Sequence, residues 1–281
     1  HLSPFTFHLS PNPLYPCSLI HLSDKFQTKM RYLLIDNSNT RTKFALCEND
    51  QLCSDIVHLS TSEITHRSVT EALAGSDCTR WDGVLLCSVV PEKAKILSEA
   101  LADISAKPLH QLNYQSNLGI GIDYPTPSQI GADRLVSGIA ANHLYTENGC
   151  AAIVIDFGTA VTFDVISNNN YLGGVIAPGL GAMTDYLANK TALLPQITLT
   201  EPDTAIGKST EEAMDIGAVY GYRGLVREII TELKKELPAN PSIICTGGDG
   251  ELIANGLKDL IHHYHPTLTL EGIKIAADLN L

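Results

Sequence analysis

The sequence predicts an α/β protein of two similar halves that face each other across a cleft. Two apolar runs, 32–35 and 152–155, each end in an aspartate and pass through a short polar turn into a second β-rich run. This pattern is typical of a β-hairpin that carries a carboxylate at the end of its first strand. The two aspartates, Asp36 and Asp156, lie 120 positions apart, a domain-sized spacing that indicates a duplicated unit.

The first half is expected at 30–146, where strands and helices alternate after the hairpin. A loop rich in glycine, proline and serine, 119–131, precedes its last helix. Apolar runs and their breakers predict the elements in this order: a helix at 62–74, a strand at 82–90, a helix at 91–101, a strand at 109–113 and a helix at 132–145.

The second half, expected at 147–281, begins with the second hairpin. A capping-box pattern, Ser209-Thr-Glu-Glu212, predicts the start of a long helix that Pro238 terminates. The expected order after the hairpin is a glycine-rich connection at 173–181, a helix through Leu187, a helix from Thr210 to Glu236 and a strand at 241–246 that ends in Gly247-Gly-Asp-Gly.

The long helix carries small and apolar residues along one face. Three of these residues are glycines. Glycine weakens a helix, so the close approach of another backbone is the expected reason for their presence. We therefore expect this face to form a homodimer interface, although packing inside one subunit fits the same periodicity. The residues of the face are Ala213, Ile216, Gly217, Val219, Tyr220, Gly221 and Gly224.

Composition limits the partners of the chain. Of its 281 residues, 44% are hydrophobic and 18% charged, enough for a full core. The formal net charge of −12 argues against a nucleic acid or a membrane surface as partner, since both favour a basic stripe. ATP remains possible, because backbone amides and Mg²⁺ supply local positive potential. The seven cysteines include no C-x-x-C pair, which indicates reduced thiols in a cytoplasmic protein.

Residues 1–29 differ from the rest of the chain. His-Leu-Ser recurs at His1, His8 and His21, with prolines between the copies. The segment lacks the basic start and the apolar stretch of a signal peptide. We expect a disordered leader, translated upstream or added to the protein, with Met30 as the natural start.

Two motif-like stretches are expected to carry no chemistry. Gly207-Lys-Ser-Thr210 imitates the end of a Walker A loop, but Pro202 stands where that loop needs its first glycine. His262, His263 and His265 are crowded and have no Cys or acidic residue at ligand spacing, so we expect a solvated helix end rather than a metal site. A dinucleotide-binding G-x-G-x-x-G between a strand and a helix is also missing from the sequence.

Two features suggest phosphate chemistry. Turn amides and hydroxyls of the hairpins can hold phosphates, and their aspartates can hold cations, although ordinary core hairpins have the same residues. In the segment 124–134, Gly131 permits an unusual turn, and Asp133 and Arg134 follow at a helix start. A carboxylate there can take a proton from an alcohol while the guanidinium holds an anionic substrate end. The alternative is a structural Asp–Arg pair that caps the helix.

Five motifs in register resemble those of the type III pantothenate kinases, and the resemblance covers the chain from about Met30 to its C-terminus. That family belongs to the acetate and sugar kinase/Hsp70/actin superfamily, whose members have two ribonuclease-H-like halves with the active site in the cleft between them. The motifs are Asp36–Lys43, Gly131–Arg134, Asp156–Ala160, Gly173–Gly179 and Thr246–Gly248.

The resemblance implies transfer of the γ-phosphate of ATP to the 4′-hydroxyl of pantothenate, the first step of coenzyme A biosynthesis, by a homodimer that uses Mg²⁺ and a monovalent cation (K⁺ or NH₄⁺). It implies that Asp133 is the general base, that Asp156 binds the monovalent cation and that Asp36 lies near Mg²⁺. Contacts to ATP are implied for Asp36, Asn37, Ser38, Asn39, Thr40, Arg41, Thr42, Lys43 and Thr159, and contacts to pantothenate for Tyr124, Gly131, Ala132, Asp133, Arg134 and Thr210.

The chain departs from the family at the first turn, where Asn37 and Ser38 replace an apolar residue and a glycine. If that glycine adopts a positive φ, Ser38 introduces strain or displaces a phosphate-binding amide. Two alternatives stay open. One is another phosphotransferase or phosphatase of the superfamily, such as an exopolyphosphatase-like hydrolase, which has no need of the segment 124–134. The other is a non-catalytic protein of the same fold, against which the three retained aspartates argue.

Overall fold

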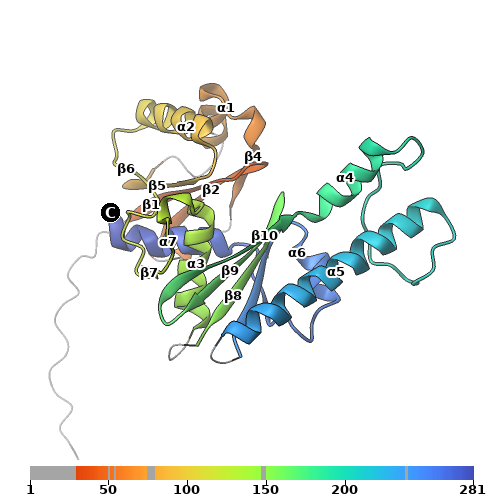
Figure 1. The fold of residues 1–281 in the computed structure, drawn as a ribbon. Helices are drawn as coiled ribbons and strands as arrows, with labels where there is room; N and C mark the ends of the chain where they lie inside the picture. The colour runs from red at the N-terminus through yellow and green to blue at the C-terminus, as the bar shows by residue number, and fades with distance from the viewer. Residues whose placement is uncertain (1–29, 50, 54, 75–79, 147–149, 238–239) are drawn as a thin grey trace, which may run out of the picture.

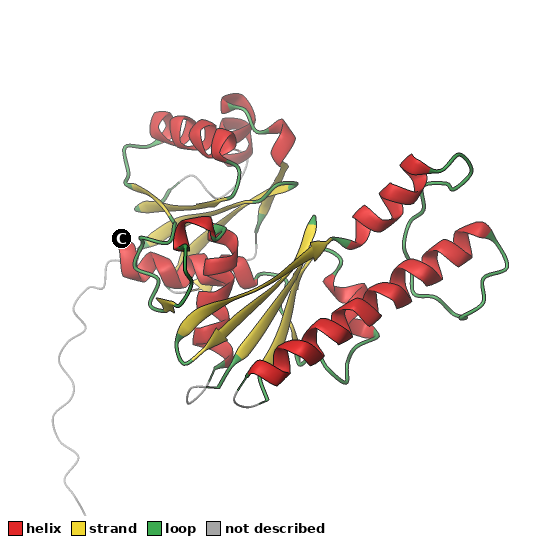
Figure 2. Ribbon diagram, in the orientation of Figure 1, coloured by secondary structure: helices red, strands yellow, loops and turns green. Residues whose placement is uncertain are grey.

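Two mixed β-sheets with helices on their faces make up the described part of the chain (Figures 1 and 2). The computed structural model describes residues 30–281 except 50, 54, 75–79, 147–149 and 238–239, so the expected leader at 1–29 lies outside the described residues. In this part of the chain, each helix is too short or too polar to cross a membrane.

The first sheet is built around the first hairpin. Strand β1 (Arg31–Asn37) pairs antiparallel with β2 (Arg41–Glu48) and parallel with β5 (Gly83–Ser88). The apolar run of β1 is covered on both faces, which explains why its hydrophobic residues are continuous rather than alternating. The sheet order is β3-β2-β1-β5-β6, with β4 also paired to β2, and the short strands are β3 (Gln51–Leu52), β4 (Val57–Ser60) and β6 (Leu109–Gln111).

The second sheet repeats this arrangement. Strand β8 (Ala152–Phe157) pairs antiparallel with β9 (Ala160–Ser167) and parallel with β11 (Ser242–Gly247), as β1 does with β2 and β5. The predicted duplication is therefore confirmed at the level of strand pairing. The order is β12-β11-β8-β9-β10-β7. The edge strands are β7 (Gly121–Ile122) and β12 (His263–Tyr264), and β10 (Asn170–Pro178) lies between β9 and β7.

Helices fill three layers around the sheets, as Figure 1 shows. Packing clusters place two helices on the outer face of the first sheet, two between the sheets and three on the side of the second sheet away from the first. In that order they are α1 (His66–Ala74) and α2 (Pro91–Ile104), then α3 (Ala132–Tyr145) and α7 (Leu268–Asn280), then α4 (Leu180–Lys190), α5 (Thr210–Glu236) and α6 (Gly250–Asn255).

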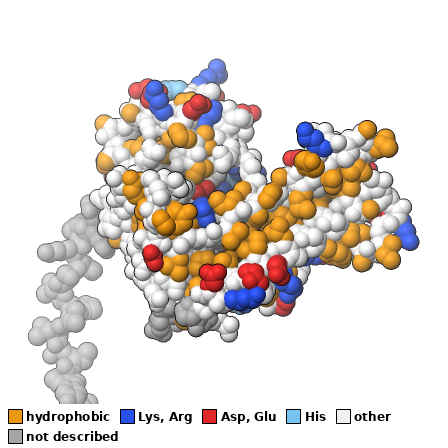
Figure 3. All heavy atoms as spheres, viewed as in Figure 1, with side chains coloured by type: hydrophobic (Ala, Val, Ile, Leu, Met, Phe, Trp, Pro, Cys, Tyr) orange, Lys and Arg blue, Asp and Glu red, His pale blue; other side chains and the backbone are white. Residues whose placement is uncertain are grey.

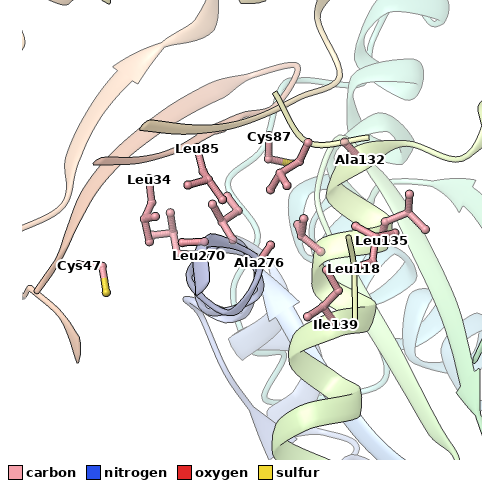
Figure 4. Packing of buried hydrophobic residues seen from close by; sticks show 14 of the residues in the cluster. Leu34, Cys47, Leu85, Cys87, Leu118, Ala132, Leu135, Ile139, Leu270 and Ala276 are labelled. Carbon is pink, nitrogen blue, oxygen red and sulfur yellow. The ribbon is translucent and has the colours of Figure 1, made fainter. Parts of the chain in front are cut away.

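The central layer joins the two halves through a common core. Figure 4 shows Leu270 and Ala276 of α7 between Leu34 and Leu85 of the first sheet and Ile139 of α3. Burial of an aliphatic side chain of this size contributes roughly 1.5–3 kcal/mol, so the layer resists separation of the halves. The chain also crosses between halves, since α7 returns to β1 and β7 joins the second sheet. A division near residue 146 stays a prediction.

Several predicted elements agree with the structure and several do not. The helices 132–145 and 210–236 are confirmed, and Ser209 accepts a hydrogen bond from the backbone N–H of Glu212, as the capping box requires. The predicted helix 62–74 starts at His66, after a 3₁₀ turn at Thr61–Glu63. Part of the predicted glycine-rich connection is strand β10, which accommodates Gly173 through a bulge. Where a helix end was expected at His262–His265, the structure has the two-residue strand β12 (His263–Tyr264).

Candidate active site

The turns of the two hairpins meet, although they are far apart in sequence. The hydroxyls of Thr40 and Thr159 lie 2.8 Å apart, at hydrogen-bond distance, and both residues are exposed. Each turn follows a strand that ends beside an aspartate, Asp36 on β1 and Asp156 on β8. The duplicated hairpins therefore bring two polar turns and two carboxylates to one place.

The first turn closes without the strain expected at Ser38. Its backbone N–H donates to the carbonyl of Arg41 at 3.2 Å, and the described non-glycine residues with positive φ are Asn49, Asn168 and Asn169. Ser38 has no positive φ, so the strain considered there is absent, whereas displacement of a phosphate-binding amide stays a prediction. The serine hydroxyl instead donates to Oδ1 of Asp36 at 2.8 Å and so orients that carboxylate.

The predicted nucleotide-binding residues divide into buried and accessible ones. Asn37 and Thr42 are buried, and the amide of Asn37 donates to Oγ1 of Thr42 at 2.8 Å. The hydroxyl of Ser88 donates to the other side of the Asn37 amide at 2.6 Å. These side chains therefore support the turn from inside. The predicted residues exposed on the turn surface are Asn39, Thr40, Arg41 and Thr159.

Four carboxylates influence one another near the turns: Asp36, Asp133, Asp156 and Asp164. Burial, together with the negative charges of Asp36 and Asp133, raises the pKa of Asp156 to about 7. Lys43 offsets part of this negative charge, since its Nζ lies 3.2 Å from Oδ2 of Asp36. Such a concentration of negative charge is suited to cations.

Asp133 is the second residue of α3 and is half-buried. Burial raises its pKa to about 6, even though its Oδ1 accepts a hydrogen bond from the backbone N–H of Arg134 at 2.7 Å. Gly131 has a φ of −59°, so the unusual turn expected there was wrong. The reason for glycine is space, because a Cβ at this position would lie 2.5 Å from Oδ1 of Asp133.

Arg134 does not pair with its neighbour Asp133. Its Nε donates to Oδ1 of Asp164 at 2.7 Å, which argues against the alternative of a structural Asp133–Arg134 pair. Asp164, which also accepts from the hydroxyls of Thr162 and Tyr171, was not predicted from the sequence. A usable signal was present, because an ionisable residue inside the apolar run of β9 is rarely buried without a partner.

The remaining predicted substrate residues lie in different places. Tyr124 is 37% exposed, and a Cβ on Gly173 would lie 3.3 Å from its ring, so it stands over β10 beside the site. Ala132 packs into the core between the sheets, which leaves only its backbone for a ligand. Thr210 is not brought to Asp133: it lines an apolar cavity of about 890 Å³ between α4 and α5, with Met183, Leu187 and Met214 among the other lining residues.

The described residues offer suitable donors for the cations implied by the resemblance, but they do not form a complete coordination site. Among the described residues, no group of three or more His, Cys, Asp or Glu side chains is arranged to hold a metal ion. Asp36 and Asp156 offer hard carboxylate oxygens, which suit Mg²⁺ and K⁺. A cation held by one of them would take its other ligands from phosphate, water or backbone, as Mg²⁺ at nucleotide sites usually does.

Comparison with known proteins decides which family this site belongs to. The family model described as type III pantothenate kinase matches residues 32–232. A type III pantothenate kinase of Akkermansia muciniphila is 52% identical over 253 residues, which cover 90% of this chain and all of the relative. The chain belongs to the type III pantothenate kinase family. It is therefore a kinase of a family that phosphorylates pantothenate at the entry to coenzyme A biosynthesis.

A second type III pantothenate kinase, from Methylacidiphilum infernorum, is 39% identical over 250 residues and covers 88% of each chain. Solved structures agree with the fold. A Baf family transcriptional activator of Campylobacter jejuni matches with a TM-score of 0.55 at 21% identity, covering 88% of this chain and 97% of its own. The ethanolamine utilization protein EutJ of Carboxydothermus hydrogenoformans matches with a TM-score of 0.52 at 17% identity, covering 87% of this chain and 89% of its own. At these identities the structures support the two-lobed, actin-like fold alone.

Proposed function

We propose that Asp133 accepts the proton of the 4′-hydroxyl of pantothenate while the γ-phosphate of ATP is transferred to that oxygen. The observation that carries this proposal is the placement of Asp133, a half-buried carboxylate at the start of α3 within the charge cluster that surrounds the two joined turns. A pKa of about 6 leaves this carboxylate largely ionised at neutral pH and still basic enough to assist proton removal.

The two turns are proposed to hold the phosphates of ATP. The hydroxyls of Thr40 and Thr159 lie 2.8 Å apart and share one hydrogen bond. A phosphate placed there would replace that bond with two, because each hydroxyl could donate to a phosphate oxygen. Phosphoryl transfer depends mainly on alignment and on neutralisation of charge. We assign Asp36 and Lys43 to this task, Asp36 as the holder of Mg²⁺ and Lys43 as the adjacent fixed cation. Bound Mg²⁺ would supply Lewis-acid stabilisation of the phosphates.

Asp156 is proposed to hold the monovalent cation. Its carboxylate is crowded by Asp36 and Asp133, which raise its pKa in addition to burial. A potassium or ammonium ion beside it would offset that repulsion and keep the carboxylate ionised. On the substrate side, Tyr124 and Arg134 are proposed to flank pantothenate, with the guanidinium directed to its anionic end.

A homodimer is proposed because the predicted face of α5 stays open in the single chain. Gly217, Gly221 and Gly224 are exposed, and a Cβ on any of them would meet no atom within 4 Å in the described part of the chain. Val219 is the exception to the predicted face, since it is fully buried within the single chain. Figure 3 shows hydrophobic side chains gathered over β10, α4 and α5. On β10, on α4 and in the loop between α4 and α5, the side chains of Ile176, Tyr186, Leu193 and Ile206 are 62–91% exposed.

An apolar surface of this extent is typical of a subunit interface. The cavity lined by Thr210 belongs to the same surface, so a second copy is the proposed means by which Thr210 reaches a substrate site. We also propose a cytoplasmic location, supported by five free cysteines in the described residues, three of them buried.

A coupled assay for ADP tests the proposal. Purified protein is supplied with Mg-ATP and pantothenate in potassium buffer, and omission of pantothenate provides the background. Pantothenate-dependent ADP release is expected, and it should fall when tetramethylammonium replaces potassium. Hydrolysis of ATP or polyphosphate without pantothenate would instead support a superfamily hydrolase, and the absence of any turnover would support a non-catalytic protein.

A further inference from the structure

The guanidinium of Arg134 is held on one side only. Its Nε donates to Asp164, whereas its Nη2 is buried and has no hydrogen-bond partner within the described residues. A buried guanidinium nitrogen without an acceptor costs free energy, and structures rarely retain one unless a ligand completes it. Nη2 therefore still requires an acceptor, which water or a ligand oxygen would supply.

The side chains behind the guanidinium are fixed. Oδ1 of Asp164 accepts hydrogen bonds from Nε of Arg134 and from the hydroxyl of Tyr171, each at 2.7 Å. Oδ2 of the same carboxylate accepts from the hydroxyl of Thr162 at 3.0 Å. Asp164 is 1% exposed and Tyr171 is completely buried, so neither can reorient without disturbing the core.

The neighbouring strand packs closely against Nη2. Gly174 of β10 lies beside the guanidinium, and a Cβ at that position would come 3.2 Å from Nη2. The same Cβ would lie only 1.7 Å from the carbonyl oxygen of Phe163, so a side chain is excluded there by the sheet itself. Tyr171 is a second neighbour of the guanidinium on β10. The centre of its ring lies 6.0 Å from Cζ of Arg134 and supports the guanidinium.

We propose that Asp164 and Tyr171 are positioning residues for pantothenate, which aim Nη2 of Arg134 at an oxygen of its anionic end and so determine its affinity. This inference rests on the proposed function, in which Arg134 contacts the substrate. Asp164 and Tyr171 act through Arg134, because supporting side chains fix the direction of the group that touches the ligand. Their loss should therefore weaken pantothenate binding more than phosphoryl transfer.

Steady-state kinetics of Asp164→Asn and Tyr171→Phe test the inference. Loss of a hydrogen bond between charged groups should raise KM for pantothenate about 10- to 100-fold in Asp164→Asn, with KM for ATP unchanged. Tyr171→Phe keeps the ring and removes only the hydroxyl, so its effect should be smaller and in the same direction. Asp259→Asn is the control, because it breaks the exposed Arg227–Asp259 pair and should leave both KM values unchanged.

Calorimetric titration of pantothenate, with a non-hydrolysable ATP analogue present, gives a readout that does not depend on turnover. A purely structural role would lower the active fraction and kcat while KM and the dissociation constant stayed at wild-type values, and that result would overturn the inference. If Asp164→Asn does not fold, Tyr171→Phe decides by the same criterion. Failure of the wild-type enzyme to phosphorylate pantothenate would refute the proposed function instead, so the two failures are distinguishable.

Discussion

The aspartates near the turns differ in their neighbours, and these neighbours suggest different roles. Asp36 is held by Lys43 at 3.2 Å and by the hydroxyl of Ser38 at 2.8 Å, as suits a fixed anion that binds a cation. Asp164 is saturated with hydrogen bonds from Arg134, Thr162 and Tyr171. Asp133 accepts only a backbone hydrogen bond among those the structure records within the described residues, which leaves it able to accept a substrate proton.

Replacement of Asp133 by asparagine should remove turnover and keep ATP binding. The amide has the size of the carboxylate but cannot accept the hydroxyl proton, and general-base catalysis is typically worth about 10²–10⁴-fold in rate. The measurement is kcat together with the ATP dissociation constant from titration. Asp259→Asn, a change in an exposed ion pair far along the chain, serves as the control. Turnover within a few-fold of wild type would remove Asp133 from the role of base.

The pH profile should report the raised pKa of Asp133. Only the ionised carboxylate accepts a proton, so kcat/KM for pantothenate should rise with pH through about 6 and then level off. The folded pKa lies above the ordinary value of 3.8, so the unfolded state releases this proton more easily. The free energy of unfolding should therefore decrease as the pH rises from about 4 to about 6. A profile that is flat from pH 5 to 8 would contradict the assignment.

At the scale of elements, the sequence predicted what depends on local pattern. The aspartate-ended hairpins and helices α3 and α5 follow from periodicity and caps, and they were confirmed. Strand β10 was missed because Gly173 and Gly174 are strand breakers by propensity, whereas the sheet needs glycine where a Cβ on Gly174 would strike Phe163. The Arg134–Asp164 pair joins α3 to β9, and although the position of Asp164 in an apolar run indicates a partner, no local pattern identifies that partner as Arg134.

The second turn depends on a glycine at the start of α4. A Cβ on Gly179 would lie 2.4 Å from the carbonyl oxygen of Gly158 and 2.5 Å from that of Thr159, both backbone atoms. Gly179→Ala should therefore displace the turn and raise KM for ATP by about tenfold, in keeping with a cost of roughly 1–3 kcal/mol for overpacking. Gly181→Ala is a matched control, because a Cβ there meets nothing within 4 Å in the described residues. Equal KM values in the two variants would contradict this role of the turn.

At the scale of the whole molecule, the two halves share one central layer, yet one surface remains uncovered. Helices α3 and α7 bury their faces against both sheets, whereas the glycine face of α5 and the cavity beside α4 face outward. Sequence periodicity could not decide between internal packing and a dimer for this face. The exposed glycines favour the dimer, because a face packed inside the subunit would not leave them open.

The protein should be a dimer in solution, and Gly221→Leu should weaken it. A Cβ at this exposed position would meet nothing within 4 Å in the described part of the chain, whereas a leucine would separate two helices that pack closely across an interface. Light scattering should show twice the 30.3 kDa mass for the wild type and a shift toward the monomer for the variant. Activity should fall when the dimer is lost, since Thr210 lies at the start of the same helix. A monomeric wild-type protein with full kinase activity would refute this coupling.

Removal of potassium should abolish activity and lower stability at high pH. Because the pKa of Asp156 is about 7, its carboxylate becomes mostly charged in the fold as the pH rises past neutral, and repulsion from Asp36 and Asp133 is then greatest. A bound cation should therefore raise the melting temperature more at pH 8 than at pH 6. Melting curves in potassium and in tetramethylammonium chloride test this expectation. Identical curves at pH 8 would exclude a cation site at Asp156.

Direct identification of the product is the measurement closest to the central claim, which is phosphorylation of the pantothenate hydroxyl at the site formed by the two turns and α3. Wild-type protein and Asp133→Asn are incubated with Mg-ATP, potassium and pantothenate, and the products are separated and examined by mass spectrometry and ³¹P NMR. The expected result is 4′-phosphopantothenate in amounts equal to ADP with the wild type, and none above background with the variant. Equal product from both proteins, or ADP without phosphopantothenate, would contradict the claim.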